Sequence, residues 1–291
     1  MITGTVGFLG PKGSFTETAA KALLPDKKRI PFRSIPDSID AVKGNQVECT
    51  VVPLENAIEG SVNITLDYLI HHQRLEIAAE IIAPIQQHLL VRPENKTSWH
   101  IVNKIFSHPH AIAQCHQFLR KNFPDTEIKH MNSTAAAAKY ISEQSDKNFA
   151  AIANTIASKE YGLEIVQTEI NDYENNSTRF IVLVKEVSGE NLFIRSKEKK
   201  FKTTFMVTLP LDYSGALHQV LSAFSWRKIN LSKIESRPRK TGLGNYYFII
   251  DADIKIDKIL IPGVCEELKA LGFGVEILGS YPCFVWSGSY H

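Results

Sequence analysis

A threonine and an arginine stand side by side where a polar segment of this chain runs into an apolar one. Residues 175–180 read Asn-Asn-Ser-Thr-Arg-Phe, and an apolar strand is predicted over 180–184. Because a strand fixes its side chains in space, the hydroxyl of Thr178 could assist a departing oxygen. The guanidinium of Arg179 could hold a carboxylate through two hydrogen bonds. Strand alternation puts the two side chains on opposite faces, which argues against both meeting one ligand.

A glycine-containing turn follows the predicted strand 6–9 and is suited to hold an anion. It contains Lys12, Gly13 and Ser14, and Ser14 and Glu17 have the spacing of a capping box. Free backbone amides at the start of a helix, together with the lysine, would attract negative charge. A plain tight turn with a good helix cap is the alternative interpretation.

A second polar segment stands at the end of the predicted strand 50–53. Glu55 and Asn56 follow this strand, and Gly60 and Ser61 are predicted to open the next helix. Proteins of the α/β class bind ligands at the carboxyl ends of their strands. A surface loop with a helix cap is again the alternative.

A serine and two histidines, Ser107, His108 and His110, precede a helix that is predicted over 109–123. The proline between the histidines suits the first helical position, with Ser107 or His108 as the cap. Gln114 would lie just past the first turn, close to the end of the helix that faces a ligand cleft. The histidines suggest a metal site, but no carboxylate or cysteine partner has suitable spacing, so no metal is predicted.

Ser133 and Thr134 form another hydroxyl-rich helix start. Helix N-termini from these segments, together with Arg179, would favour a small molecule that bears carboxylates. The sequence contains no Gly-x-Gly-x-x-Gly fingerprint and no Walker loop. We therefore expect chemistry without a cofactor, or simple binding.

The composition is that of an ordinary globular protein, with 291 residues, 44% hydrophobic and 22% charged. Lys and Arg number 33 against 31 Asp and Glu, so the net charge of +2 gives no bulk electrostatic case for nucleic acid or for an anionic membrane. No apolar run is long enough for a membrane helix, and the start does not resemble a signal peptide. The four scattered cysteines are expected to be free thiols in a cytoplasmic protein: Cys49, Cys115, Cys265 and Cys283.

Short apolar runs alternate with helical patterns in the first part of the chain, which predicts an α/β fold with mainly parallel sheets. The expected strands are 6–9, 30–32, 50–53, 75–82, 89–91, 104–107, 127–131, 149–152 and 180–184. The expected helices are 14–24, 36–43, 64–71, 109–123, 134–144 and 155–161. These strands could form one wide sheet or two lobes. Two successive extended segments over 75–93 favour two lobes, with 178–184 as the return crossing and a ligand cleft between them.

Residues 189–200 are charged and poor in apolar side chains, which is typical of a linker. The pattern then restarts with the order βαββαβ, which predicts a ferredoxin-like unit. Its expected strands are 203–209, 230–236, 246–254 and 274–278, and its expected helices are 214–226 and 261–271. Residues 242–245 suit a hairpin turn, and the sequence after Tyr281 has no readable periodicity.

Five motifs, in this order, resemble the prephenate dehydratase family: Gly10-Pro-Lys-Gly-Ser-Phe, Pro53-Leu-Glu-Asn, Gly60-Ser-Val, Ser107-His-Pro and Thr178-Arg-Phe. Two motifs of the second part, Gly215-Ala-Leu-His218 and Glu235-Ser-Arg-Pro238, resemble its regulatory ACT domain. The likeness runs from about residue 4 to residue 283. It implies a two-lobed catalytic domain over 1–188, similar to periplasmic binding proteins, and an ACT domain over 201–283, followed by a tail over 284–291. Lobe one would comprise about 1–82 and 180–188, and lobe two about 83–179.

The resemblance also implies a reaction, in which prephenate becomes phenylpyruvate, water and carbon dioxide on the way to phenylalanine. No cofactor is implied. Thr178 would assist the leaving hydroxyl, with Glu55 as a possible proton source if its pKa is raised, while Ser107 and Gln114 belong to the catalytic set. The substrate-binding set implied is Lys12, Gly13, Ser14, Asn56, Gly60, Ser61, Ser133, Thr134, Arg179 and Phe180.

By the same resemblance, L-phenylalanine would bind between two ACT domains and inhibit the enzyme, which requires a homodimer or a homotetramer. The effector residues implied are Gly215, Ala216, Leu217, His218, Asn230, Leu231, Glu235, Ser236, Arg237 and Pro238. Ser214 replaces a proline that is frequent in the family, and we expect it to cap the helix equally well. Arogenate dehydratase and a non-catalytic amino-acid-binding regulator are the alternatives.

Overall fold

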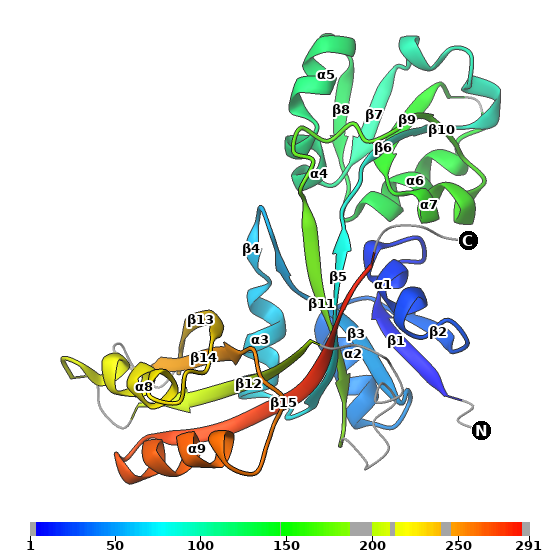
Figure 1. The fold of residues 1–291 in the computed structure, drawn as a ribbon. Helices are drawn as coiled ribbons and strands as arrows, with labels where there is room; N and C mark the ends of the chain where they lie inside the picture. The colour runs from blue at the N-terminus through cyan, green and yellow to red at the C-terminus, as the bar shows by residue number, and fades with distance from the viewer. Residues whose placement is uncertain (1–3, 146, 187–199, 210–212, 240–245, 287–291) are drawn as a thin grey trace. The chain divides into compact units, whose positions relative to one another are not determined.

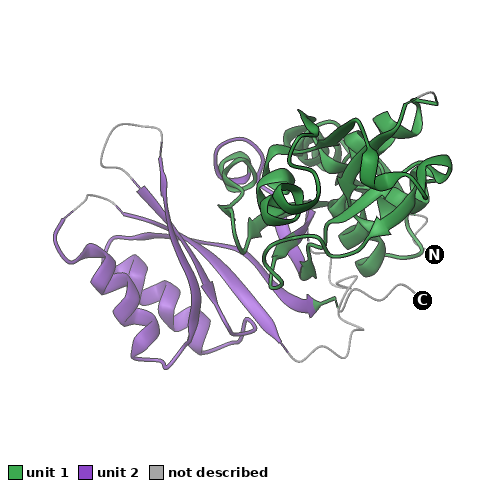
Figure 2. Ribbon diagram, turned by 90° about the horizontal axis from the view of Figure 1, so that it is seen from above, with its two compact units in different colours: residues 1–68, 81–180, 285–291 green, residues 69–80, 181–284 purple. Residues whose placement is uncertain are grey.

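The computed structural model describes residues 4–145, 147–186, 200–209, 213–239 and 246–286. Most of the predicted linker, the predicted hairpin turn at 242–245 and the last residues of the tail lie outside these ranges. The chain forms two compact units (Figure 2). Unit 1 comprises Met1–Tyr68, Ile81–Phe180 and Val285–His291, and unit 2 comprises Leu69–Glu80 and Ile181–Phe284. Among the described residues, no helix has the length and apolar character needed to cross a membrane.

The first sheet of unit 1 has a parallel core. Strand β1 (Thr5–Leu9) pairs in parallel with β2 (Lys28–Phe32) and with β3 (Cys49–Asn56). Helices α1 (Phe15–Leu23) and α2 (Ile35–Lys43) connect these strands. Each helix begins at a serine whose hydroxyl accepts a hydrogen bond from a backbone amide of the first turn, as the capping-box spacing predicts for α1.

The predicted helix start at Gly60 and Ser61 is wrong. These residues form the short strand β4 (Gly60–Ser61), which returns antiparallel to β3 and pairs Glu55 with Ser61. Gly60 has a φ of 81°, a backbone conformation that glycine adopts without strain, so it allows the tight reversal. Helix α3 (Asn63–His71) begins two residues later.

The second sheet of unit 1 has the order β10-β6-β9-β7-β8. Its strands are β6 (His88–Val91), β7 (Lys104–Ser107), β8 (Glu127–His130), β9 (Phe149–Ala153) and β10 (Glu164–Gln167). The pairings of β7 with β8 and β9 are parallel, whereas β6 pairs antiparallel with β9 and β10. This sheet is therefore mixed, and its strand β10 was not among the predicted strands. Two separate sheets in the first part agree with the prediction of two lobes.

Strand alternation gives the second sheet two apolar faces, and helices lie on both sides of this sheet (Figure 1). Leu89, Ile105 and Ile152 form one core with α4 (Pro109–Gln114) and α5 (His116–Asn122). Their neighbours Leu90, Phe106 and Ala151 form the other core with α6 (Thr134–Ser142) and α7 (Thr155–Tyr161). The sheet thus holds the N-termini of α4 and α6 in fixed positions.

The helix predicted over 109–123 is broken at Cys115, which separates α4 from α5. The break is held by Asp172. Its backbone amide donates to the carbonyl of Gln114 at 2.6 Å, and its carboxylate accepts from the amide of Gln117 at 3.1 and 3.2 Å. A residue far along the chain thus satisfies the backbone groups that a continuous helix would have paired.

A buried histidine in the second lobe uses both ring nitrogens. Nδ1 of His88 accepts from the amide of Glu169 at 3.0 Å, and its Nε2 lies 3.1 Å from the hydroxyl of Thr155. Since Nδ1 accepts, the neutral ring carries its hydrogen on Nε2 and donates it to Thr155. Burial lowers the pKa of His88, and the charge of Glu169 opposes that shift.

Strands β5 (Glu76–Pro84) and β11 (Ser177–Val184) are each divided between the two units. In sequence, β5 leads from the first sheet to β6, and β11 follows the last strand of the second sheet, as the crossover prediction requires. Within unit 1, the amide of Ile85 donates to the carbonyl of Asn176 at 2.9 Å. This bond ties the end of one crossing to the start of the other.

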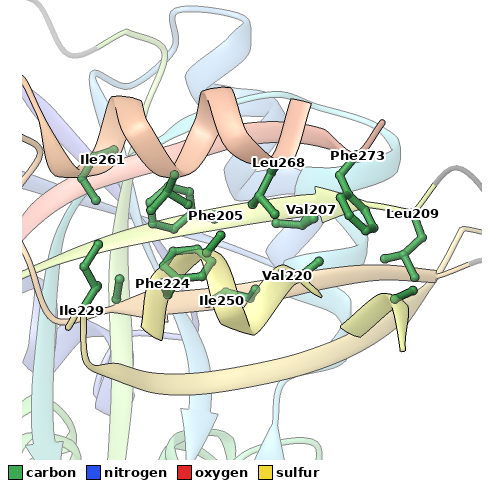
Figure 3. Packing of buried hydrophobic residues seen from close by; sticks show 14 residues of the cluster. Phe205, Val207, Leu209, Val220, Phe224, Ile229, Ile250, Ile261, Leu268 and Phe273 are labelled. Atoms are coloured by element: carbon green, nitrogen blue, oxygen red, sulfur yellow. The ribbon is translucent and has the colours of Figure 1, made fainter. Parts of the chain in front are cut away.

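Unit 2 contains the predicted βαββαβ order. Its elements are β12 (Phe201–Thr208), α8 (Ala216–Ser225), β13 (Leu231–Pro238), β14 (Tyr246–Ala252), α9 (Leu260–Ala270) and β15 (Gly274–Val285). The antiparallel strand order is β13-β14-β12-β15. Figure 3 shows the helices packed on this sheet, with the rings of Phe205 and Phe224 meeting edge to face at 5.3 Å.

Two predictions for unit 2 are wrong. Strand β15 does not end near residue 278 but runs to Val285, because its second half continues to pair with β12 as far as Pro282 opposite Phe201. Ser214 does not cap α8. The N-cap is Gly215, whose φ of 90° places it in the left-handed region, and the structure records no side-chain cap.

Unit 2 also buries a cluster of polar side chains within its sheet. The hydroxyl of Thr204 donates to Oδ1 of Asp251 at 2.6 Å and lies 2.6 Å from the hydroxyl of Tyr281. All three side chains are almost fully buried. Because the single proton of Thr204 goes to Asp251, Tyr281 is the donor in the second bond.

Candidate functional site

A cavity of about 480 Å³ lies in unit 1 and is lined from both of its sheets. Segments at β1–α1 and β3–β4 contribute from the first sheet, and the starts of α4 and α6 contribute from the second. The residues of the predicted site that line it are Ser14, Asn56, Gly60, Ser61, Gln114, Ser133, Thr134, Thr178 and Phe180. The structure therefore brings together side chains that are separated by more than a hundred residues in the sequence.

The cavity wall also contains residues that were not among the predicted site residues. They are Leu9, Gly10, Phe15, Thr16, Pro53, Glu59, Val62, Ile85, Gln87, His108, His110, Ala111 and Asn132. Five of them belong to the motifs quoted above: Gly10, Phe15, Pro53, Val62 and His108. Five more stand directly beside a motif or a predicted residue, and that position was the signal that could have found them: Leu9, Thr16, Glu59, His110 and Asn132. His108 was weighed as a helix cap and, together with His110, as a metal ligand. Ile85 and Gln87 lie outside every motif and had no such signal.

Four predicted residues of the strand ends and first turn do not line the cavity. Nζ of Lys12 lies 3.7 Å from a carboxylate oxygen of Glu160, and the amide of Gly13 donates to the carboxylate of Glu17 at 2.7 Å. The hydroxyl of Ser107 is fully buried and donates to the carbonyl of Ile152 at 2.7 Å.

The fourth is Glu55, which forms a pair with Arg179, a fifth predicted residue that is absent from the wall. Nη1 of Arg179 lies 3.6 Å from Oε2 of Glu55, and the arginine side chain is almost entirely buried. Neither side chain lines the cavity, whereas Thr178 and Phe180 on either side of the arginine do. This is the outcome that strand alternation predicts for neighbours on β11.

The hydroxyl oxygen of Thr178 is held by Asn56. Nδ2 of Asn56 donates to Oγ1 of Thr178 at 2.9 Å and to Oδ1 of Asn176 at 2.9 Å, with a longer contact of 3.3 Å to the carbonyl of Ser177. In the part of the chain that the structure describes, no atom accepts a hydrogen bond from the Thr178 hydroxyl. Its proton is therefore left for a ligand in the cavity.

Hydrogen bonds continue from Asn176 along the cavity wall. Its Nδ2 donates to Oε1 of Gln114 at 3.1 Å, and Nε2 of Gln114 donates to Oε1 of Glu59 at 3.3 Å. Oε2 of Glu59 lies 3.6 Å from Nδ1 of His110. We call Thr178, Asn56, Asn176, Gln114 and Glu59 the amide series. It joins side chains of β11 and β3, which belong to the first sheet, to a side chain of α4, which packs on the second sheet.

His108 is both the N-cap of α4 and part of the cavity wall. Its Nδ1 accepts from the amide of His110 at 3.3 Å. Burial lowers the pKa of His108, the neighbouring His110 lowers it further, and the carboxylate of Glu59 acts in the opposite direction. The ring is thus kept neutral as an acceptor at the start of the helix.

Two helices of nine residues begin at the cavity. Ser14 caps α1 and Ser133 caps α6, and both serines line the wall. The N-terminus of a helix carries partial positive charge from its unpaired amides, so both ends favour an anion. No lysine or arginine is present among the described residues that line the cavity, so these helix ends and neutral side chains supply the donors.

The predicted effector residues lie in unit 2, at the start of α8 and along β13. Ala216 is buried behind Gly215, and His218 is exposed on the first turn. On β13, Glu235 lies 3.1 Å from Lys233 and 3.5 Å from Arg237. Asn230, just before this strand, donates to Asp253 at 2.6 Å. Leu231 and Pro238 are the first and last residues of β13, and Leu217 and Ser236 lie beside the residues already placed.

Within the described ranges, no group of three or more His, Cys, Asp or Glu side chains is placed to hold a metal ion. The four cysteines are free thiols. Burial raises the pKa of Cys49 and of Cys115 to about 12, which leaves both in the protonated form.

Comparison with known proteins gives a consistent result. Residues 6–188 match the family model of prephenate dehydratase. The chain is 50% identical over 284 residues to the prephenate dehydratase of Bacillus subtilis (strain 168). This alignment covers 96% of this chain and 99% of that protein. The crystal structure of prephenate dehydratase in complex with L-Phe from Arthrobacter aurescens is similar, with a TM-score of 0.84 and 33% identity, covering 96% of this chain and 90% of that one. The prephenate dehydratase of Staphylococcus aureus Mu50 gives a TM-score of 0.79 at 30% identity, covering 95% and 99%.

Proposed function

This chain belongs to the prephenate dehydratase family, and we propose that the cavity of unit 1 is where it converts prephenate to phenylpyruvate, water and carbon dioxide. The observation that carries this assignment of the site is the Thr178 hydroxyl. It stands at the wall of a cavity of about 480 Å³ with its oxygen held by Asn56. We place the catalytic domain at 1–188 and the ACT domain at 201–283.

Thr178 assists the departure of the ring hydroxyl. Loss of carbon dioxide and water makes the ring aromatic, and this change drives the reaction, so the enzyme needs chiefly to orient the ring and help the oxygen leave. A threonine hydroxyl is too weak an acid to protonate the leaving group outright. It therefore acts by donating a hydrogen bond that strengthens as negative charge builds up on the departing oxygen, and the departing hydroxide takes from solvent the proton that completes the water molecule.

The N-termini of α1 and α6 bind the carboxylate that remains in the product. Ser14 and Ser133 mark these helix ends on the cavity wall. The carboxylate that leaves as carbon dioxide disperses its charge in the transition state, so a strong cationic contact there would favour the substrate over the transition state. A wall whose described residues include no lysine or arginine is consistent with that requirement.

Unit 2 binds L-phenylalanine and transmits inhibition. The Arthrobacter relative was crystallised with L-Phe, and Gly215, at the start of α8, leaves the backbone open to a ligand because it has no side chain. The effector residues at α8 and β13 then act across two subunits of a homodimer or homotetramer. This oligomer and a cytoplasmic location remain predictions.

The test is phenylpyruvate formation from prephenate by the purified protein, with and without L-phenylalanine. We expect turnover that L-phenylalanine suppresses. Turnover without suppression would overturn the effector site alone. Absence of turnover by folded protein would overturn the catalytic proposal, and parallel assays with arogenate would then show whether the amino analogue is the substrate.

A further inference from the structure

We propose that Asn176 is a positioning residue, which fixes the amide of Gln114 so that this side chain offers the cavity a hydrogen-bond donor and not an acceptor. The proposal rests on the function proposed above and extends it, because the substrate is an anion that loses an oxygen. Asn176 was not among the predicted site residues. It is only 2% exposed and lies between two cavity side chains, Asn56 and Gln114.

The direction of the amide series is fixed at its first end by the backbone. Oδ1 of Asn56 accepts from the amides of Ile58 and Glu59, each at 3.0 Å. A backbone N–H can only donate, so the oxygen of Asn56 must face the turn and its Nδ2 must face Thr178 and Asn176. Asn176 consequently meets this donor with its own carbonyl oxygen.

The far end of the series imposes the same direction. An ionised carboxylate can only accept, so Gln114 must turn its Nε2 toward Glu59. Its Oε1 is then left facing Nδ2 of Asn176. Asn176 joins the two ends because its short side chain carries one acceptor and one donor, in the order that both neighbours require.

Two donors remain at the cavity as a result. Oγ1 of Thr178 accepts from Asn56, so its own proton is unengaged. Nε2 of Gln114 has two hydrogens, and Glu59 is the one acceptor for them among the described residues. If Gln114 turned over, it would present its oxygen both to Glu59 and to the anionic substrate, which is repulsive.

The experiment compares Asn176→Asp with Asn176→Leu in the full-length protein. An ionised aspartate still accepts from Asn56 but has no donor for Gln114, so Gln114 must turn its Nε2 toward position 176. Leucine offers neither group. We expect both substitutions to lower kcat/KM for prephenate by about 10- to 100-fold above neutral pH, mainly through KM, which is the range for one lost or misdirected hydrogen bond at a charged group.

The pH profile separates positioning from mere filling of space. A protonated aspartate at position 176 regains a donor for Gln114 while it still accepts from Asn56. We therefore expect kcat/KM of Asn176→Asp, relative to the unsubstituted protein, to recover reversibly as pH falls, and that of Asn176→Leu to stay low. The titratable groups around this position are Glu59, His108 and His110, with the Glu55–Arg179 pair on the adjoining strands, and division by the unsubstituted protein's profile removes their contribution.

Asn171→Asp is the matched control, since Asn171 precedes the same strand but bonds to Gln87 and Tyr173 outside the series. It should leave kcat/KM and its pH profile unchanged. Equal losses in Asn176→Asp and Asn176→Leu at every pH, or no loss in either, would overturn the positioning role. Should Asn176→Leu fail to fold, the reversible recovery of Asn176→Asp still decides. Turnover by the unsubstituted protein is measured first, so failure of the proposed function is seen separately.

Discussion

Two threonine hydroxyls, one in each unit, are held by neighbouring side chains and differ in what remains of their hydrogen-bonding capacity. Thr204 of unit 2 receives a hydrogen bond from Tyr281 and gives its proton to Asp251. Thr178 of unit 1 receives a hydrogen bond from Asn56 and keeps its proton at the wall of a cavity. The Thr204 hydroxyl therefore has an acceptor for its proton within the fold, whereas the Thr178 hydroxyl has one only when a ligand is bound.

Burial alone does not distinguish the two sites, because both threonines are buried. The difference lies in the number of acceptors that the fold supplies. A buried cluster in which every proton has an acceptor stabilises the fold and has nothing left to offer. A cluster in which one hydroxyl proton has no acceptor, at the wall of a cavity, can donate that proton in a hydrogen bond to a ligand.

Replacing Thr178, whose hydroxyl proton has no acceptor among the described residues, should have the largest effect, and that effect is on turnover. Thr178→Val keeps the size of the side chain but removes the donor, so we expect kcat for prephenate to fall by about 10²–10³-fold, the usual cost of losing one hydrogen-bond donor to an oxygen that gains negative charge. Steady-state assays would measure this, with thermal unfolding and L-phenylalanine binding as controls that should hardly change. Near-normal turnover would show that Thr178 has no part in the mechanism and that its hydroxyl does not differ in function from that of Thr204.

Replacing Thr204, whose hydroxyl both donates and accepts a hydrogen bond within the fold, should lower stability and leave turnover unchanged. Thr204→Val removes the hydrogen bond to Asp251 and the one from Tyr281 within a buried site, so we expect the free energy of unfolding to fall by about 1–3 kcal/mol. Chemical denaturation would measure the loss, while kcat at a temperature where the variant is folded should match that of the unsubstituted protein. A loss of turnover in folded Thr204→Val would show that this buried cluster also serves catalysis.

The smallest effect is expected at His88, which lies in the same unit as the cavity and has both ring nitrogens hydrogen-bonded. The effect is on how stability depends on pH. Its folded state is neutral with a lowered pKa, whereas an unfolded histidine takes up a proton near pH 6.5. The unfolded state then binds more protons in acid, so this residue removes stability as pH falls below about 6.5. In His88→Asn, the amide oxygen can still accept from Glu169, and thermal midpoints should fall less on acidification. An unchanged acid dependence would show that His88 is not held neutral.

Much of the fold follows from local sequence, because most elements are capped and patterned by their own residues. The serine caps of α1 and α6 and the βαββαβ order of unit 2 were predictable for that reason. The break at Cys115 was not, because Asp172 holds it from more than fifty residues away. The missed strand β10 likewise takes its partner, β6, from a distant part of the chain.

The site was predictable in its membership more than in its orientations. Polar segments at strand ends indicated nine wall residues, and seven of them lie at or after the carboxyl ends of β1, β3, β7 or β8, where parallel strands meet at one edge. The direction in which each side chain points was harder to predict from the sequence. Ser107 turns into its own sheet to meet Ile152, and Lys12 turns toward Glu160. Asn176 was overlooked because its importance comes from two partners distant in the sequence, Asn56 and Gln114, that no local pattern reveals.

The contacts of Asp172 and Asn176 with α4 have a consequence for how this protein tolerates change in length. Asp172 holds the backbone of Gln114, Asn176 holds its side chain, and Thr178 follows two residues later on β11. Surface connections usually accept insertions at little thermodynamic cost. Residues 172–178 are instead a spacer of fixed length, because one added or deleted residue would shift the three contacts out of register together. A graft or shuffled chimera of this protein should therefore carry that segment and α4 as a single block.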